Sequence, residues 1–579
     1  MPQDIPSRDD PPQEAPPWAE PAVNDAAQKG DGRWEVIVKY NGDLASVSRA
    51  LNAQAETLGA RYAILTMDKE VINSLNGFPE IEYWELPQAL APQTISGLSD
   101  GYIAAGMQGT YGLQGRGVLV AVLDSGIDYR HRDFMYEDGT TRILAVWDQD
   151  GVGAAPTGFF EGVEYTAKDI NYALISGAQL PATDTLGHGT AVAGVATGNG
   201  AASGGRNAGV APQASLVVVK LAQRGDRNLT RTTELMRGIR YALNKAMEFH
   251  MPVAINISYG TNNGAHDGNS LFETYINEMA QQWKNVIVVG TGNEGAAGHH
   301  YSATLREGES VSAPFSVPPG TRSLYLTLWK NFADTFSYEL VSPGRESSGM
   351  LHIADAQSAF LLGETVVQFA VGMPTHYNTD QEVFFRLEAG RAAAVQEGIW
   401  MLHVYAADVV HGRFDIWLPT EEDVTTRTAF LNPDAATTLT LPSTAHHVIS
   451  VGGYNAALNS TMAFSGRGYT RNDVYVKPDL VAPAYQIVSA HMGGGYSAYS
   501  GTSFAAPFVT GAAALMMEWG IVRGNDPFLY GQKIKAFMRR NALRNKQIAY
   551  PNPIWGYGAL NLGETLGELV RLKRLWNGD

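Results

Sequence analysis

The chain has 579 residues, of which 45% are hydrophobic and 17% charged, with 62 glycines. That length exceeds one ordinary domain core, and the composition is typical of a compact, loop-rich globular protein. The formal net charge is −16 and no Lys/Arg block occurs, so we do not expect nucleic acid as a partner. Cysteine is absent from the sequence, which excludes disulfides, thiolate metal sites and a cysteine nucleophile.

The N-terminal part of the chain divides into a tail and a small folded unit. Residues 1–32 are rich in Pro, Asp, Glu and Gln, so we expect a flexible tail that resembles neither a secretory signal nor a membrane anchor. Residues 33–93 predict a unit of βαββ type, with strands at 34–40, 60–67 and 81–86 and helices at 46–59 and 69–78. Because a unit of this size is marginal alone, we expect it to dock on the rest of the chain.

The remaining chain predicts an α/β domain that is interrupted by a β domain. In residues 94–296, buried apolar strands alternate with helices, which favours a parallel sheet covered on both faces. Residues 297–435 contain short alternating segments separated by Gly, Pro, Asn and Asp, which predict an antiparallel sandwich or jelly roll. Residues 436–579 return to the parallel-sheet pattern. The β domain is therefore an insert, which we expect beside the 290–296 loop, where it restricts substrate entry.

Three polar side chains occupy positions suited to nucleophilic catalysis. Asp124 ends the apolar run VLVAVLD, and open parallel sheets bind ligands at the carboxyl ends of their strands. His188 lies between two glycines at the start of a small-residue helix. Ser503 begins a buried helix, with Pro507 expected in its first turn, and its hydroxyl faces the positive helix end. A hydroxyl, an imidazole and a carboxylate together can perform acyl transfer.

Acyl transfer also needs donors for the developing oxyanion. Asn293, on the glycine-flanked loop GTGNEG, is one candidate, and the backbone N–H of Ser503 is the other.

The ordered phrases VAVLDSGID, DTLGHGTAVAGV, VVGTGNEG and SGTSFAAPFVTGAAAL resemble the subtilase family. The resemblance covers about residues 110–296 and 440–565. It implies a subtilisin-like serine endopeptidase that hydrolyses peptide bonds through an acyl-enzyme and requires no cofactor. It further implies a cleft in which the substrate backbone pairs between two walls. One wall would be Ser258, Tyr259 and Gly260, and the other Gly290, Thr291 and Gly292.

The β insert and the short N-terminal unit resemble, more narrowly, the Csp subtilases of clostridial spores. Those enzymes process the proform of a cortex-degrading hydrolase during germination. The resemblance implies a proenzyme with a ferredoxin-like prodomain that acts as inhibitor or chaperone, a protein substrate and a cytoplasmic or spore-associated location. We expect self-cleavage within 86–97, between Gln93 and Thr94.

Several alternatives stay open at this stage. A broad-specificity degradative subtilisin, or a partner-binding scaffold or sensor with a little-used protease site, would share these motifs. Structural calcium near Asp128 and Asp133 also stays open, as does the oligomeric state. The pairs His299–His300 and His446–His447 lack metal-site spacing and are interpreted as core or solvated histidines. The basic helix with Lys533, Lys535, Arg539 and Arg540 is interpreted as a solvated face.

Overall fold

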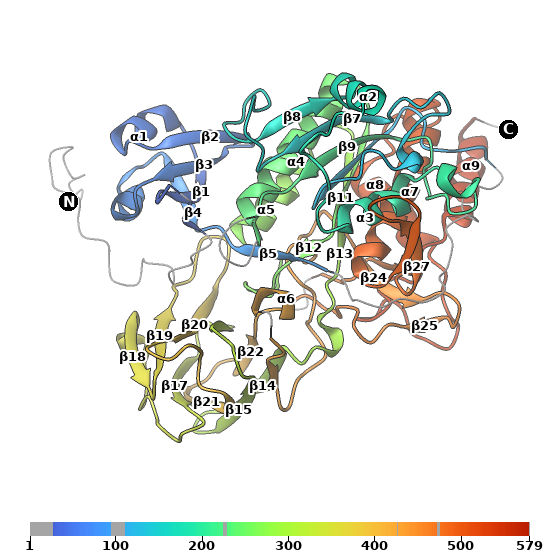
Figure 1. Ribbon diagram of the computed structural model, residues 1–579. Helices are drawn as coiled ribbons and strands as arrows, with labels where there is room; N and C mark the ends of the chain where they lie inside the picture. The colour runs from blue at the N-terminus through green and yellow to red at the C-terminus, as the bar shows by residue number, and fades with distance from the viewer. Residues whose placement is uncertain are drawn as a thin grey trace, which may run out of the picture.

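The computed structural model describes residues 27–29, 31–93, 111–223, 229–424, 426–471 and 475–577. Three parts are visible in Figure 1: an N-terminal unit in blue, a large domain built on a central sheet, and a β sandwich in yellow. Strand β5 (Ala89–Pro92) leaves the N-terminal unit and runs between the other two parts.

The large domain is built on a nine-stranded sheet whose central strands are parallel, as the sequence predicts. Along β6, Val120 and Val122 pack into one hydrophobic core, whereas Leu119 and Leu123 pack into another core on the opposite face. Both faces are therefore buried, which explains the nearly continuous apolar strands. In spatial order the strands are β8 (Val163–Thr166), β7 (Ile143–Asp148), β9 (Ser215–Lys220), β6 (Leu119–Asp124), β11 (Val253–Ile257), β13 (Asn285–Gly290), β24 (Ile449–Asn455) and β25 (Ser460–Thr461), with β26 (Leu480–Pro483) also paired to β24.

Helices cover both faces of this sheet. On one side lie α2 (Ala167–Ser176), α3 (His188–Thr197), α7 (Thr502–Met517), α8 (Gly531–Arg540) and α9 (Leu562–Asn577), and on the other α4 (Thr232–Glu248) and α5 (Leu271–Met279). Every residue of α7 is buried, so this helix is apolar on all sides. The span 502–522, which continues α7 through a π turn, is long and apolar enough to cross a membrane, but it is 89% buried and forms the core of the domain.

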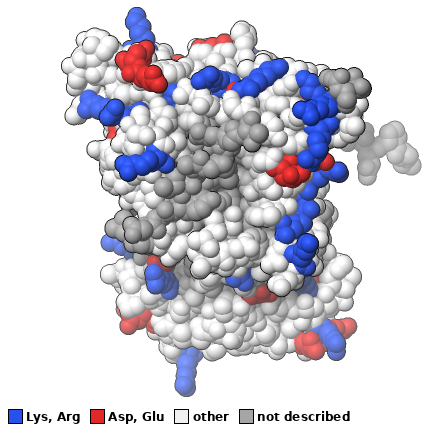
Figure 2. All heavy atoms as spheres, turned by 90° about the vertical axis from the view of Figure 1, so that its right-hand side faces the viewer, with Lys and Arg blue, Asp and Glu red and all other residues white. Residues whose placement is uncertain are grey.

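The basic face of α8 is only partly solvated: Lys533 and Arg540 reach solvent, as the sequence interpretation expects, whereas Lys535 and Arg539 turn toward a buried carboxylate. Lys535 is only 4% exposed, and its ammonium lies 3.4 Å from the carboxylate of Asp479. Arg539 and Lys477 pair with the same carboxylate. These cations gather around one buried anion, and this is what makes their burial tolerable. On the face shown in Figure 2, Lys and Arg side chains lie mostly toward the margins, several of them in a column along the right-hand edge, with Asp and Glu among them.

The N-terminal unit has the ferredoxin-like strand order β2–β3–β1–β4, with every neighbouring pair antiparallel. The predicted helix over 46–59 is wrong in its second half. Helix α1 ends at Ala50, and Asn52 takes a φ of +49°. The chain then continues as an edge strand that pairs with β3 and contacts α4. The predicted helix at 69–78 is a 3-10 helix. The elements are β1 (Trp34–Tyr40), α1 (Leu44–Ala50), β2 (Gln54–Gly59), β3 (Tyr62–Met67), the 3-10 helix Lys69–Gly77 and β4 (Ile81–Glu85).

The end of the predicted flexible tail is also ordered. Ala27 is fully buried, and the ammonium of Lys29 pairs with Glu161 and lies 3.7 Å from Glu35. Ion pairs therefore hold this segment in place, although its composition predicts flexibility. Residues 1–26 lie outside the described part.

The insert is a two-sheet antiparallel sandwich, and its strands run from His300 to Phe430. Large aromatic side chains such as Phe315, Phe385 and Trp400 fill the space between the sheets. One sheet contains β14 (His300–Thr304), β22 (Arg413–Trp417), β16 (Ser323–Asn331), β20 (Asp380–Ala389), β19 (Thr365–Val371) and β18 (Ser358–Leu362), and the other β17 (Thr335–Val341), β21 (Gly398–Asp408), β15 (Ser310–Val317) and β23 (Ala429–Phe430).

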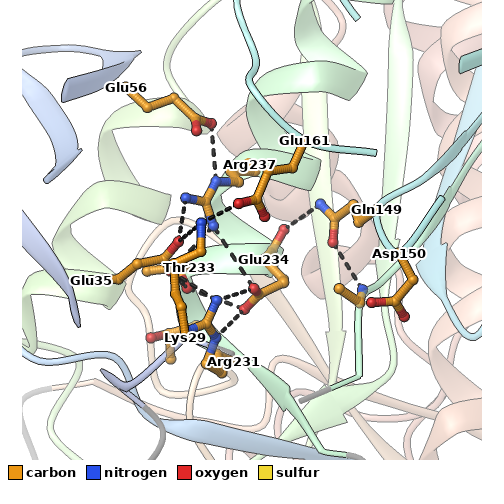
Figure 3. A network of polar contacts seen from close by, with 12 residues as sticks. Lys29, Glu35, Glu56, Gln149, Asp150, Glu161, Arg231, Thr233, Glu234 and Arg237 are labelled. Carbon is orange, nitrogen blue, oxygen red and sulfur yellow. Dashed lines mark hydrogen bonds and ion pairs between the residues drawn. The ribbon is translucent and has the colours of Figure 1, made fainter. Parts of the chain in front are cut away.

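A buried network of charges joins the N-terminal unit to α4 (Figure 3). Glu35 of β1 accepts from Arg237 at 2.8 Å and lies 2.9 Å from Arg231, while Glu56 of β2 lies 3.0 Å from Arg237. On the α4 side, Glu234 pairs with Arg231. Burial opposes ionisation of Glu35, but the charges of Arg237 and Arg231 outweigh it and hold the pKa of Glu35 well below its usual range. The unit therefore docks through desolvated ion pairs.

We expect Glu35→Ala to lower the free energy of unfolding by about 3–5 kcal/mol, because it leaves two buried arginines short of their anion. Denaturant unfolding followed by tryptophan fluorescence measures the loss. The control is Glu564→Ala, which removes an exposed pair with Arg571 and should leave the midpoint unchanged. A Glu35 variant as stable as this control would contradict the prediction.

Candidate active site

The three predicted side chains meet at one edge of the central sheet. Asp124 is the last residue of β6, His188 the first of α3, and Ser503 the second of α7. His188 Nδ1 lies 2.6 Å from Asp124 Oδ1. This approach requires glycine beside the histidine, since a Cβ at Gly189 would lie 2.2 Å from the carbonyl oxygen of Gly126.

The surroundings of His188 favour its charged form. Burial disfavours the imidazolium, but the charge of Asp124, its hydrogen bond and the charge of Asp184 outweigh this, so the pKa of His188 is raised from its ordinary value. The other ring nitrogen, Nε2, has no hydrogen-bond partner in the described part of the chain. It is therefore free to accept a proton.

Strand β5 lies in the cleft as a peptide would. It pairs antiparallel with β12 (Tyr259–Gly260) on one side and with β10 (Thr230–Arg231) on the other. At its end, the backbone N–H of Gln93 donates to the carbonyl of Ser258 at 3.1 Å. The predicted wall of Ser258, Tyr259 and Gly260 thus contacts the peptide directly.

The second predicted wall is wrong, because β10 takes the place that was assigned to residues 290–292. The backbone groups of that segment already have partners. Thr291 N–H donates to Val451, its carbonyl accepts from Thr440, and Gly292 N–H donates to Thr502 Oγ1. They therefore cannot pair with a peptide backbone, and this segment lines the pocket for the Gln93 side chain instead.

The carbonyl group of Gln93 contacts Ser503. Ser503 Oγ donates to this carbonyl oxygen at 2.5 Å, and Ser503 N–H donates to it at 3.3 Å. The amide oxygen of Asn293 accepts from Thr502 N–H at 3.1 Å, while its Nδ2 is buried without a partner in the described part of the chain. Of the two predicted oxyanion donors, the Ser503 N–H contacts this carbonyl, and Asn293 is held beside the same helix by its bond to Thr502. Thr94 lies outside the described residues.

The side chain of Gln93 fills a closed pocket, which we call the S1 pocket. Gln93 is 5% exposed. Its Nε2 donates to Thr440 Oγ1 at 2.7 Å, and its Oε1 lies 3.4 Å from Thr502 Oγ1. A Cβ at Gly260 would lie 2.2 Å from Nε2, and one at Gly290 would lie 2.7 Å from Oε1. Glycine at both positions makes room for an amide side chain.

Pro507 lies beyond the first turn of α7, because the helix begins at Thr502. A proline there removes the N–H that would bond to the carbonyl of Ser503. Ser258 Oγ donates to that carbonyl instead, at 3.1 Å. The proline therefore ties the nucleophile's helix to the cleft wall.

Sequence reasoning missed Asp184, although it begins the phrase DTLGHG. Its carboxylate accepts from Ser125 Oγ at 2.8 Å, from Gly187 N–H at 2.8 Å and from Thr190 N–H at 2.8 Å. It thus holds the turn after Asp124 against the start of α3. Thr440 and β10 were also missed, and they carry no local sequence signal because only folding brings them to the cleft.

The insert contacts the oxyanion loop, as expected. Glu294, next to Asn293, lies 2.5 Å from His299 Nδ1 and accepts from Asn262 Nδ2 at 2.8 Å. Burial opposes ionisation of Glu294, but His299 outweighs it and lowers the pKa of Glu294.

The acidic residues near the triad are bound to protein donors. Asp128 accepts from Gly493 N–H at 2.9 Å, and Asp133 accepts from Tyr496 Oη at 2.8 Å. Among the described residues, no group of three or more His, Asp or Glu is arranged to hold a metal ion.

Comparison with known families identifies the class. A subtilase family profile matches residues 115–351 and 425–558, and a Csp protease B prodomain profile matches residues 21–88. The chain belongs to the subtilase family, the subtilisin-like serine proteases. The solved CspB protease of Clostridium perfringens is 36% identical, with a TM-score of 0.75 over 81% of this chain and 96% of that one. Within the family, the chain is of the Csp type.

Curated relatives are more distant. The minor extracellular protease Vpr of Bacillus subtilis is 24% identical over 82% of this chain and 54% of its own length. The PI-type proteinase of Lactococcus lactis subsp. cremoris is 24% identical over 77% of this chain and 25% of its own length. The chain therefore spans between a quarter and about half of these relatives.

We expect Asp184→Ala to lower the free energy of unfolding by about 1–3 kcal/mol, because it leaves several buried donors unpaired. Thermal or denaturant unfolding measures this. Asp138→Ala is the control, since that carboxylate is exposed and caps only its own turn at Thr140, so its loss should leave the midpoint unchanged. Equal midpoints for the two variants would contradict the role given to Asp184.

Proposed function

We propose that this protein is an active serine endopeptidase, made as a proenzyme, that cuts its own chain after Gln93 and then cleaves specific protein substrates. The observation that carries the proposal is the contact of Ser503 Oγ and N–H with the Gln93 carbonyl, at the end of a strand paired in the cleft.

Each side chain has a role in that reaction. Ser503 Oγ attacks the carbonyl carbon of Gln93 while His188 Nε2 takes its proton. Asp124 fixes the tautomer of His188 through Nδ1 and stabilises the imidazolium. Asn293 and the Ser503 N–H stabilise the oxyanion. The bond to Thr94 then breaks as His188 protonates the leaving amine, and water hydrolyses the ester.

The S1 pocket supports a narrow specificity over broad degradation. A glutamine amide can donate to Thr440 and accept from Thr502 at once, whereas a carboxylate cannot donate to Thr440. A site that hydrogen-bonds its substrate rejects analogues lacking those groups. We therefore infer that glutamine is preferred before the scissile bond.

The substrate that we propose is the proform of another protein, such as a spore cortex hydrolase, cleaved in the cytoplasm or in the spore. The likeness to CspB supports this role, and so does a cleft that is partly enclosed by the insert. The scaffold or sensor alternative is less well supported, because Ser503 contacts the Gln93 carbonyl, His188 pairs with Asp124, and Asn293 is held beside the helix of Ser503 by its bond to Thr502.

We expect the wild-type protein to be processed to a chain that begins at Thr94, and Ser503→Ala to remain uncut, because Ser503 is the residue whose hydroxyl contacts the Gln93 carbonyl in the described part of the chain. N-terminal sequencing of both proteins reads this out. Ser497→Ala in β28 (Tyr496–Tyr499) is the matched control and should be cut normally. The same new N-terminus in Ser503→Ala would mean that another protease cuts.

Hydrolysis by the processed enzyme should fall about tenfold per pH unit below the pKa of His188, because the imidazolium cannot accept the serine proton. The midpoint should lie above 6.5, since the charge of Asp124 and its hydrogen bond raise that pKa. The pH profile of kcat/KM for a fluorogenic Leu-Ala-Pro-Gln peptide measures it. Asp124→Asn should move the midpoint down, and a profile without a fall on the acid side would contradict the role of His188.

A further inference from the structure

The insert covers the peptide in the cleft two residues before Gln93. Its last helix, α6 (Glu421–Val424), packs against β5. Side chains alternate along a strand, so Ala91 points to the same side as Gln93. Ala91 is 4% exposed, and a residual space of about 10 Å³ beside it is lined by the peptide, by Glu294 and by Thr420 and Glu422 of the insert.

This covering wall is acidic. Glu422 forms no ion pair in the described part of the chain. Its neighbour Glu294 is already paired with His299. The adjacent Glu421 is exposed and pairs with Arg427 at 3.1 Å. Burial, followed by the charge of Glu294, raises the pKa of Glu422 to about 7. A carboxyl that is destabilised in this way gains most from a cation placed beside it.

We propose that α6 forms a subsite, here called S3, that favours Lys or Arg two residues before the scissile glutamine and rejects Asp or Glu, with Glu422 setting the preference. The inference rests on the proposed cleavage after Gln93 and names the substrate class of that same site. The space beside Ala91 is too small to hold a longer side chain in a folded-back conformation. Such a chain must extend along the half-buried Glu422 toward solvent, where its charge meets the carboxylate.

The test exchanges Ala91 in the full-length chain for Lys, Gln and Glu, which are similar in length and differ in charge. Processing after Gln93 is timed during cell-free synthesis at about pH 8, where Glu422 is ionised. We expect the order Lys, Gln, Glu from fastest to slowest, with about a tenfold difference between Lys and Glu.

A second set of variants changes the charge of Glu422. In a Glu422→Gln background the Lys-to-Glu ratio should fall toward one, and in Glu422→Lys it should invert. Glu421→Gln, on the same helix but exposed, should keep the wild-type ratio. If all three exchanges at Ala91 block processing through size, fluorogenic Leu-Lys-Pro-Gln and Leu-Glu-Pro-Gln peptides given to processed wild-type enzyme measure the same ratio.

The outcomes separate the inference from the function on which it rests. Equal rates for Lys and Glu, with the wild type cut after Gln93, would overturn the S3 subsite and leave the protease intact. Absence of Ser503-dependent cutting in the wild type would overturn both.

Discussion

The structure depends on one strand lying in the cleft. β5 pairs with β12 and β10, and its end is fixed by Ser503 on the carbonyl of Gln93 and by Thr440 on the amide. This strand belongs covalently to the N-terminal unit, borders α6 of the insert and fills the S1 pocket of the large domain. The three parts therefore meet at this strand, so the position of the Gln93 carbonyl on Ser503 depends on how the prodomain docks.

Docking uses buried charge as well as apolar contact. Besides the network around Glu35 and Arg237, the carboxylate of Glu85 accepts the N–H of Leu271 at the start of α5. Burial and the charge of Glu273 raise the pKa of Glu85 to about 8, so near pH 7 this carboxyl is largely protonated and contributes a hydrogen bond, not a charge. Buried ion pairs such as Glu35–Arg237 are sensitive to geometry, because displacing one partner leaves the other charge buried and unpaired. Such an interface suits a prodomain that must present one bond to the nucleophile.

The insert acts on the site from two directions. Through His299 it holds Glu294, next to the oxyanion asparagine, and through α6 it covers the peptide. Its attachment includes ring stacking, because Trp417 of the insert stacks on His266 of the large domain and on His300, with centroids 4.1 and 4.8 Å away. The insert therefore supplies a wall of the cleft beside β5.

The sequence by itself determined the parallel sheet and the insert, because hydrophobic period is a local property. The triad and the oxyanion asparagine follow from short motifs, and cleavage after Gln93 is a prediction that rests on the resemblance to subtilases. Only the tertiary structure decided that residues 54–59 form a strand, that Lys535 is buried, and that β10 rather than residues 290–292 borders the peptide. Thr440 and Glu422 likewise gain their roles from contacts with segments hundreds of residues away. Such choices follow from which long-range partners satisfy backbone groups and charges, and that information is not contained in any local window.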